Sequence, residues 1–150
     1  MGNFCDFEIV FQLILAVILG GLVGLEREYI RKEAGLRTFS LVCLGATLFT
    51  LTGVEISNLL IGKAGVEFDP SRIIGQIILG IGILCAGLII FRETRIEGLT
   101  TAAALWVVAA IGATIGVRFY FLAVFTTFLA VLILAGFRFF EEKILKTKEP

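Results

Sequence analysis

The chain has 150 residues, of which 58% are hydrophobic and only 17% are charged. Its 13 basic and 13 acidic residues cancel, so the charge gives no reason to expect binding to nucleic acid. The mean hydropathy is +1.00, and a chain this apolar and this short leaves no room for a separate nucleotide-binding or catalytic domain.

Five long apolar runs occupy most of the sequence, at residues 7–25, 38–54, 73–91, 98–117 and 119–137. Each is about 17 to 20 residues long, the length that a helix needs to cross the apolar core of a bilayer. Glu8 is the only formally charged residue within them. We therefore predict an all-α integral membrane protein, a single domain of five transmembrane helices with a short tail over residues 138–150 and no soluble C-terminal domain.

The distribution of basic residues predicts the orientation in the membrane. Ten of the 13 basic residues fall in the first connection, the third connection and the tail, and three fall in the alternate segments. Because basic residues in short loops are retained in the cytoplasm, we predict the N-terminus outside and the C-terminus inside. The segment before the first run is acidic, unlike the basic start of a cleaved signal peptide, so we expect the first run to remain as a helix.

Two of the expected connections carry local signals. Residues 55–72 form the longest external connection, and Asp69 near its end is suited to cap the third helix because its carboxylate can accept backbone N–H bonds. Pro70 suits the first helical position, where its missing N–H needs no partner. Only Val117 and Arg118 separate the last two runs, which predicts a tight antiparallel pair of helices.

Small residues, mostly four apart, predict where helices approach each other closely, because close backbone contact stabilises helix pairs in lipid. The glycines that we assign to helix packing are Gly20, Gly24, Gly82, Gly87, Gly112 and Gly116. Packing within one bundle is the simpler interpretation. The alternative is a homodimer through Gly20 and Gly24, with Glu26 and Arg27 pairing across a two-fold axis.

Polar residues gather in three clusters at the predicted membrane boundaries. The first follows the first helix and includes Glu26, Arg27, Glu28, Gly35, Arg37 and Thr38. The second, at the start of the third helix, contains Asp69, Arg72 and Gln76. The third, before and at the start of the fourth helix, includes Arg92, Glu93, Thr100 and Thr101. These are the candidate functional residues, and we expect Arg37 to pair with Glu26 or Glu28.

The residue types alone allow more than one role for these clusters. The simplest role is interfacial anchoring, in which arginines bind lipid headgroups and carboxylates balance them. The alternative is a weak Mg²⁺ site at Glu26, Glu28 or Asp69, since Mg²⁺ prefers a few carboxylate oxygens and retained water. We expect no other cofactor, because the chain has no histidine.

Neither catalysis nor ion transport is favoured by the residues within the apolar runs. No nucleophile lies beside a base, so we do not expect an enzyme. No run has an acidic residue near its centre, where pumps and transporters usually keep one.

In this order and spacing, the clusters resemble the N-terminal membrane domain of the MgtC/SapB family over about residues 11–120. The segments that carry the resemblance are GLVGLEREYIRKEAGLRTFSLVCLGATLFTL, DPSRIIGQIILGIGILCAGLIIF and GLTTAAALWVVAAIGATIG. The family pattern falls on Glu26, Arg27, Gly35, Leu36, Arg37, Thr38, Asp69, Arg72, Gln76, Gly80, Gly82, Gly87, Gly98, Leu99, Thr100, Thr101 and Trp106.

The resemblance implies a protein of the bacterial cytoplasmic (inner) membrane that is linked to adaptation to low Mg²⁺. It favours a non-enzymatic regulatory protein that binds other membrane proteins, such as the ATP synthase or a transporter; the alternative is a Mg²⁺ transporter or permease. The chain departs from the pattern at Cys85, where the family often has Gly, and at Thr100 and Val107, where virulence-type members can carry Asn and Cys. We also expect no soluble C-terminal domain like that of longer members, so the shorter SapB-like branch fits better.

Overall fold

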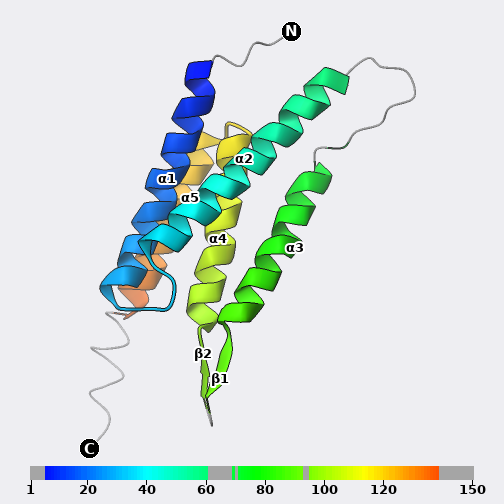
Figure 1. The fold of residues 1–150 in the computed structure, drawn as a ribbon. Helices are drawn as coiled ribbons and strands as arrows, with labels where there is room; N and C mark the ends of the chain where they lie inside the picture. Colours follow the sequence, from blue (N-terminus) through cyan, green and yellow to red (C-terminus); the bar gives the residue numbers. More distant parts are fainter. Residues whose placement is uncertain (1–5, 61–68, 70, 93–94, 139–150) are drawn as a thin grey trace, which may run out of the picture.

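The structure, a computed structural model, describes residues 6–60, 69, 71–92 and 95–138. These form five helices and one short β-hairpin (Figure 1). The elements are α1 (Asp6–Tyr29), α2 (Leu36–Leu60), α3 (Ser71–Leu88), β1 (Ile90–Arg92), β2 (Arg95–Glu97), α4 (Leu99–Gly116), α5 (Tyr120–Val131) and a π-helical continuation of α5, η1 (Leu132–Gly136). The tail predicted over residues 138–150 lies outside the described residues except for Arg138.

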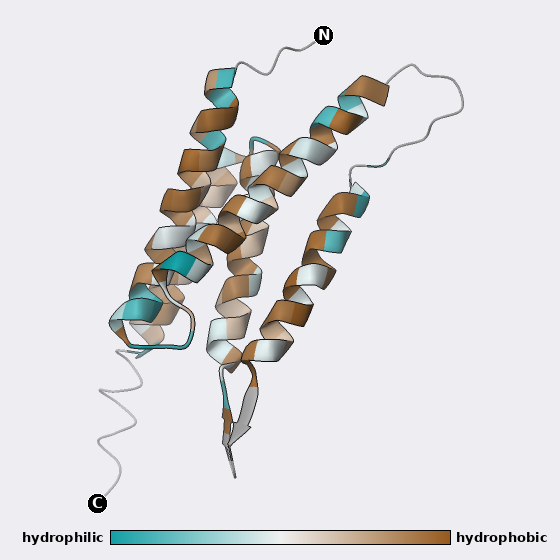
Figure 2. Cartoon of the chain, viewed as in Figure 1, coloured by the Kyte–Doolittle hydropathy of each residue, from teal (hydrophilic) through white to brown (hydrophobic). Residues whose placement is uncertain are grey.

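The helices lie where the apolar runs predict them. α1, α2, α3 and α4 are each long and apolar enough to cross a membrane, and Tyr120–Gly136 is a shorter apolar helix. Figure 2 shows apolar residues along the helices and hydrophilic residues mostly toward helix ends and connections. The predicted helical membrane protein is therefore confirmed, while its orientation in the membrane stays a prediction.

Three boundaries differ clearly from those predicted. α1 continues to Tyr29 rather than ending at residue 25, so Glu26, Arg27 and Glu28 belong to its last turns. α2 continues past Glu55, which we had placed in a connection, so this carboxylate belongs to the helix. α3 ends at Leu88 rather than at residue 91, because the apolar residues that follow enter β1, which pairs antiparallel with β2. An apolar run does not reveal whether its last residues are helix or strand. Gly98 then joins the hairpin to α4 with a φ of 87°, a conformation that favours glycine.

α2 and α4 form the centre of the bundle. α2 packs most extensively against α1 and α4, and α4 contacts each of the other four helices. Phe39 of α2 and Leu105, Val108 and Ile111 of α4 are at most 1% exposed and belong to one buried core. α3 lies at the edge of the bundle against α4, and only Cys85 of its 18 residues is buried (Figure 1).

Four of the six glycines assigned to helix packing lie in close helix contacts. A Cβ at Gly20 would lie 2.6 Å from the Cβ of Cys43, and one at Gly24 would lie 2.8 Å from the Cα of Leu36. Gly112 and Gly116 of α4 approach α2 equally closely. These glycines allow the backbones of α1 and α4 to pack directly on α2.

The other two glycines, Gly82 and Gly87 of α3, have no such neighbour, since a Cβ at either would meet nothing within 4 Å. Gly20 and Gly24 of α1, in contrast, lie directly against α2. α2 already covers both glycines within the chain, so they are not free to form the homodimer face that we placed there, and a homodimer through another surface stays a prediction.

Candidate functional site: a polar cluster at one end of the bundle

The α1–α2 connection and the β1–β2 hairpin lie at the same end of the bundle, which we call the loop end (Figure 1). The first and third polar clusters therefore come together at the loop end. The second cluster begins α3 and lies at the opposite end, which we call the far end. The bundle thus separates the sequence-predicted candidates into two groups.

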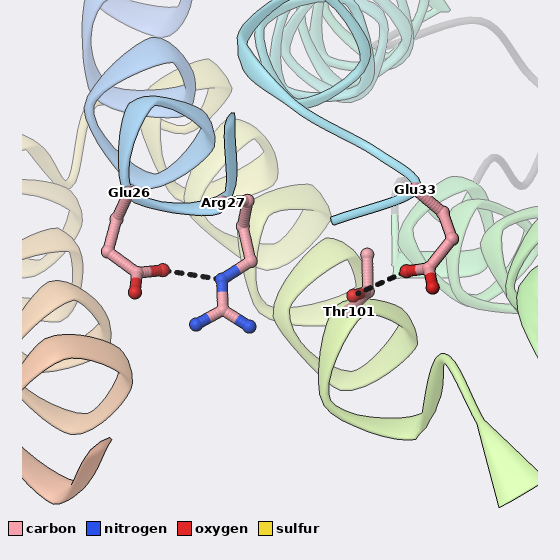
Figure 3. Close-up of polar contacts among 4 residues, drawn as sticks. All are labelled: Glu26, Arg27, Glu33 and Thr101. Carbon is pink, nitrogen blue, oxygen red and sulfur yellow. Dashed lines mark hydrogen bonds and ion pairs between the residues drawn. The ribbon is translucent and has the colours of Figure 1, made fainter. Parts of the chain in front are cut away.

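Arg27 is the most buried charged group at the loop end. Its residue is 3% exposed, and its Nε donates to Glu26 Oε2 in a short ion pair (Figure 3). The second oxygen of Glu26, Oε1, is buried and has no hydrogen-bond partner among the described residues. Because a buried charge without a partner is costly, the pair is expected to hold the end of α1 in one arrangement.

The end of α1 is shaped by two backbone hydrogen bonds. The N–H of Arg31 donates to the carbonyl of Glu28 at 3.0 Å, and the N–H of Lys32 donates to the carbonyl of Arg27 at 3.1 Å. Arg31 has a φ of 55°, the left-handed conformation that usually ends a helix at glycine. The chain therefore folds back over the last turn of α1 and places the backbone of Lys32 beside that of Arg27.

Glu28 fixes the start of α2 rather than pairing with Arg37. Its Oε2 accepts the backbone N–H of Leu36 at 2.8 Å, and a Cβ at Gly35 would lie 2.7 Å from that oxygen. Arg37 is exposed, and Thr38 is partly buried. The expected pairing of Arg37 with Glu26 or Glu28 is not seen, because each carboxylate has a nearer donor.

Glu33 links the α1–α2 connection to the start of α4. Its Oε2 accepts the hydroxyl of Thr101 at 3.4 Å, and Thr101 is 2% exposed (Figure 3). Thr100, next to it, is exposed. Sequence analysis did not single out Glu33, which stands in an ordinary charged loop. Glu93 and the side chain of Arg92 lie outside what the structure describes.

At the far end Asp69 caps α3 as predicted. Its Oδ1 accepts the N–H of Ser71 at 2.9 Å, and its carbonyl accepts the N–H of Arg72 at 3.2 Å. Hydrogen bonds from the Ser71 hydroxyl and backbone, together with the charge of Arg72, hold the pKa of Asp69 below its ordinary value. Arg72 and Gln76 are exposed on the following turns.

The weak Mg²⁺ candidates are divided between the two ends, with Glu26 and Glu28 near the end of α1 and Asp69 at the start of α3, so Asp69 cannot share an ion with the other two (Figure 1). Across the described residues, no three acidic or cysteine side chains group in a way that could hold a metal. Any Mg²⁺ bound at either end would therefore depend on one or two carboxylates and retained water.

Two polar groups that sequence analysis missed lie inside the bundle. Gln12 is fully buried; its Nε2 donates to the Ile115 carbonyl at 2.7 Å, while its Oε1 has no described partner. The hydroxyl of Thr47 is 2.9 Å from two carbonyl oxygens, those of Cys43 and Gly112. The sequence did contain a signal for Gln12 and Thr47, because each is a polar residue inside an apolar run.

A further cluster that sequence analysis missed joins α1 to the start of α5 at the far end. Glu8 Oε1 lies 3.0 Å from Arg118 Nε and accepts the Tyr120 hydroxyl at 3.1 Å. Phe11 packs edge-on against the Tyr120 ring, with centroids 5.7 Å apart. These contacts join residues that lie more than 100 positions apart in the sequence, so only the fold reveals them.

Chemically, the site offers ion pairs, hydroxyls and hydrogen-bonded carboxylates at helix ends, around a closely packed apolar interior. Together with four helices long enough to span a bilayer, this defines a helical multi-pass membrane protein with polar clusters at both ends. The chain belongs to the MgtC family, which its sequence matches over residues 13–143.

Several relatives support this membership. The chain is 41% identical over 130 residues to YhiD of Escherichia coli, which is named "Putative magnesium transporter YhiD"; the match covers 87% of this chain and 60% of YhiD. It is 37% identical to SrpB of Synechococcus elongatus, over 85% of this chain and 74% of SrpB. It is 40% identical to MgtC of Salmonella typhimurium, over 73% of this chain and 44% of MgtC. No solved structure matches.

Proposed function

We propose that this chain is a non-enzymatic regulatory protein of the bacterial cytoplasmic membrane, which binds another membrane protein during adaptation to low Mg²⁺. In this proposal the N-terminus lies outside and the loop end faces the cytoplasm, as the basic residues predict. The partner is a membrane protein such as the ATP synthase or a transporter. The observation that carries the proposal is the uncovered face of α3.

The glycines of α3 are not used for close helix contacts within the described part of the chain. A Cβ at Gly75, Gly80, Gly82 or Gly87 would meet nothing within 4 Å. Glycine costs about 1 kcal/mol relative to alanine inside a helix, so four of them weaken α3 unless something packs against them. Small residues serve close helix approach in membranes, and lipid tails need no such approach. Gly80 and Gly87 are seven residues apart and share one side of α3, which is therefore suited to a helix of another protein.

A groove between α2 and α3 extends this face. It has a volume of about 470 Å³, and its lining is apolar except for Gln76. Gly45 of α2 and Gly80 of α3 both line it, and neither is covered. An amide such as Gln76 gains from a polar partner in an apolar setting, which a partner helix can supply and a lipid tail cannot.

A Mg²⁺ transporter is the alternative, and the name of YhiD favours it. The interior of the described bundle supports it less. Gly112 and Gly116 bring α4 directly onto α2, and the hydroxyls of Thr47 and Thr50 are hydrogen-bonded to backbone carbonyls there. Oxygen atoms that are bonded within packed helices are not arranged to replace the water shell of a cation.

The proposal is tested by partner capture from native membranes. The variant Gly80→Leu/Gly87→Leu adds two side chains on one side of α3, where a Cβ at either position meets no described atom within 4 Å, so we expect a normal fold and loss of the crosslinked partner. Gly136→Leu is the matched control, because a Cβ there also meets no atom nearer than 4.0 Å. Equal recovery of the partner with the α3 variant and the control would contradict the α3 interface.

A further inference from the structure

One side of α3 carries residues at the spacing with which two helices pair. Four residues, which are successively four, three and four positions apart, form what we call the α3 seam: Gln76, Gly80, Ile83 and Gly87. This alternation of threes and fours keeps successive positions on one side of a helix, as in the seam of a coiled coil. Ile73, three residues before Gln76, continues the pattern but already lies against α2.

The α3 seam is uncovered along its length. All four of its residues are exposed, and Ile83 is 78% exposed. A Cβ at Gly80 or Gly87 would meet no described atom within 4 Å. α3 lies at the edge of the bundle, and beyond Arg72 it contains no charged residue (Figure 1). The seam is therefore open to a second apolar helix, and no charge along it repels one.

The residues of the α3 seam are complementary to a copy of themselves. In two parallel helices related by a two-fold axis, each seam residue meets its own counterpart. The amide of Gln76 both donates and accepts hydrogen bonds, so it can pair with a second Gln76. Gly80 and Gly87 allow the two backbones to approach closely, and Ile83 packs against its counterpart. One polar position in an otherwise apolar seam also fixes the register of the two helices.

The membrane itself favours this arrangement. Two copies of one chain insert with the same orientation, so their α3 helices run parallel and bring the two Gln76 amides to the same depth. An amide in an apolar setting is costly unless it is hydrogen-bonded, and Gln76 gains its partner in the pair. A cyclic dimer needs only one self-complementary patch, which the α3 seam supplies.

We propose that α3 pairs with α3 of a second copy of this chain through the α3 seam, and that the second copy and the membrane-protein partner compete for this side of the helix. Gly80 and Gly87 belong to both surfaces, so the second copy and the partner cannot cover them at the same time. The competition rests on the function proposed above, whereas the pairing does not.

The pairing is tested by energy transfer between donor- and acceptor-labelled copies of the purified full chain, in phosphatidylcholine liposomes over a range of protein-to-lipid ratios. We expect a dimer that dissociates on dilution with lipid. Gly80→Leu adds a side chain on the seam and should weaken the dimer at least tenfold, which corresponds to about 1.4 kcal/mol. Gly82→Leu is the matched control, because Gly82 lies on nearly the opposite side of α3 and also has no described neighbour within 4 Å.

Gln76→Leu tests the amide contact separately from the close approach of the glycines. We expect it to weaken the dimer about fivefold, or by about 1 kcal/mol, which is the size of an amide hydrogen bond between helices in a membrane. A chain that is monomeric at every ratio, or equal effects of Gly80→Leu and Gly82→Leu, would overturn the pairing and leave the partner interface as it stands.

The competition is tested with a crosslinked dimer. In a chain with Cys5→Ser, Ile83→Cys places a thiol on the seam, and the remaining cysteines, Cys43 and Cys85, are buried. Under mild oxidation this thiol should link two copies, because a disulfide needs Cα atoms about 4.4–6.8 Å apart, whereas Gly82→Cys should not link them. The linked dimer should capture less partner from native membranes than the same chain after reduction.

The outcomes separate this inference from the proposed function. Equal capture of the partner by the linked and the reduced forms would overturn the competition. Capture by neither form would refute the proposed function and the competition together, while the crosslink at Ile83→Cys would still support the pairing. Failure of Ile83→Cys to crosslink, or crosslinking of Gly82→Cys to the same extent, would overturn the pairing through the α3 seam.

Discussion

The contact between α4 and α2 at Gly112 gives the sharpest test of how this bundle is held together. A Cβ at Gly112 would collide with the carbonyl oxygen of Cys43 and lie 2.9 Å from the Cβ of Ala46. The oxygen belongs to a helix backbone, so it cannot move without shifting α2. We therefore expect Gly112→Ala to force the two helices apart.

The size of this effect follows from three contributions. Overpacking a close contact costs about 1–3 kcal/mol. Separation of the helices also weakens the hydrogen bond from Thr47 to the Gly112 carbonyl, at 2.9 Å, which is worth about 1 kcal/mol. Replacing glycine in a helix returns about 1 kcal/mol, so the net loss of stability is about 1–3 kcal/mol.

The assay is unfolding in mixed detergent, followed by circular dichroism and by the fluorescence of Trp106, the one tryptophan in the chain. Gly82→Ala is the matched control, because the same substitution on α3 meets nothing within 4 Å and should raise stability by up to about 1 kcal/mol. The reasoning would be refuted if Gly112→Ala were as stable as the unchanged protein, or if Gly82→Ala lost as much stability.

Three further predictions concern single residues. Arg31→Gly should raise stability by about 0.5–1 kcal/mol in thermal unfolding, because glycine adopts the left-handed conformation without strain. Arg118 has a φ of 67°, but Arg118→Gly should gain less stability because it also removes the ion pair with Glu8. Gln12→Glu should cost about 2.5–3.5 kcal/mol by placing a carboxylate in the buried interior, whereas Gln12→Leu should stay within about 1 kcal/mol, and equal effects would contradict the buried environment. Asp69 has a lowered pKa, so its stabilising contribution is present above its unfolded pKa near 4 and is lost as the pH falls below that value; Asp69→Asn should keep the cap and lose this pH dependence of unfolding.

The helices and one cap could be predicted because each depends on residues close together in the sequence. Apolar runs of spanning length located all five helices, and the short side chain of Asp69 before Ser71 located the start of α3. The end of α3 could not be found in the same way, because the apolar residues beyond Leu88 fit a strand as well as a helix.

The partners of polar residues could not be predicted, because they depend on which helix faces meet. Arg37 follows Glu26 and Glu28 across the turn between the first two helices, yet Glu26 pairs with Arg27 and Glu28 with the backbone of Leu36. Glycine spacing has the same limit. The spacing assigned both Gly20 and Gly82 to helix packing. Only the fold shows that α2 covers Gly20 and that Gly82 has no neighbour within 4 Å.

The central claim is that this chain acts by binding a partner and does not carry Mg²⁺ itself. The direct measurement is Mg²⁺ entry into sealed liposomes that contain the purified chain and a Mg²⁺-sensitive dye. We predict entry no faster than into empty liposomes at any Mg²⁺ gradient. Entry well above that background, abolished by Glu26→Ala or Asp69→Ala in chains that remain folded, would contradict the claim and identify a transporter.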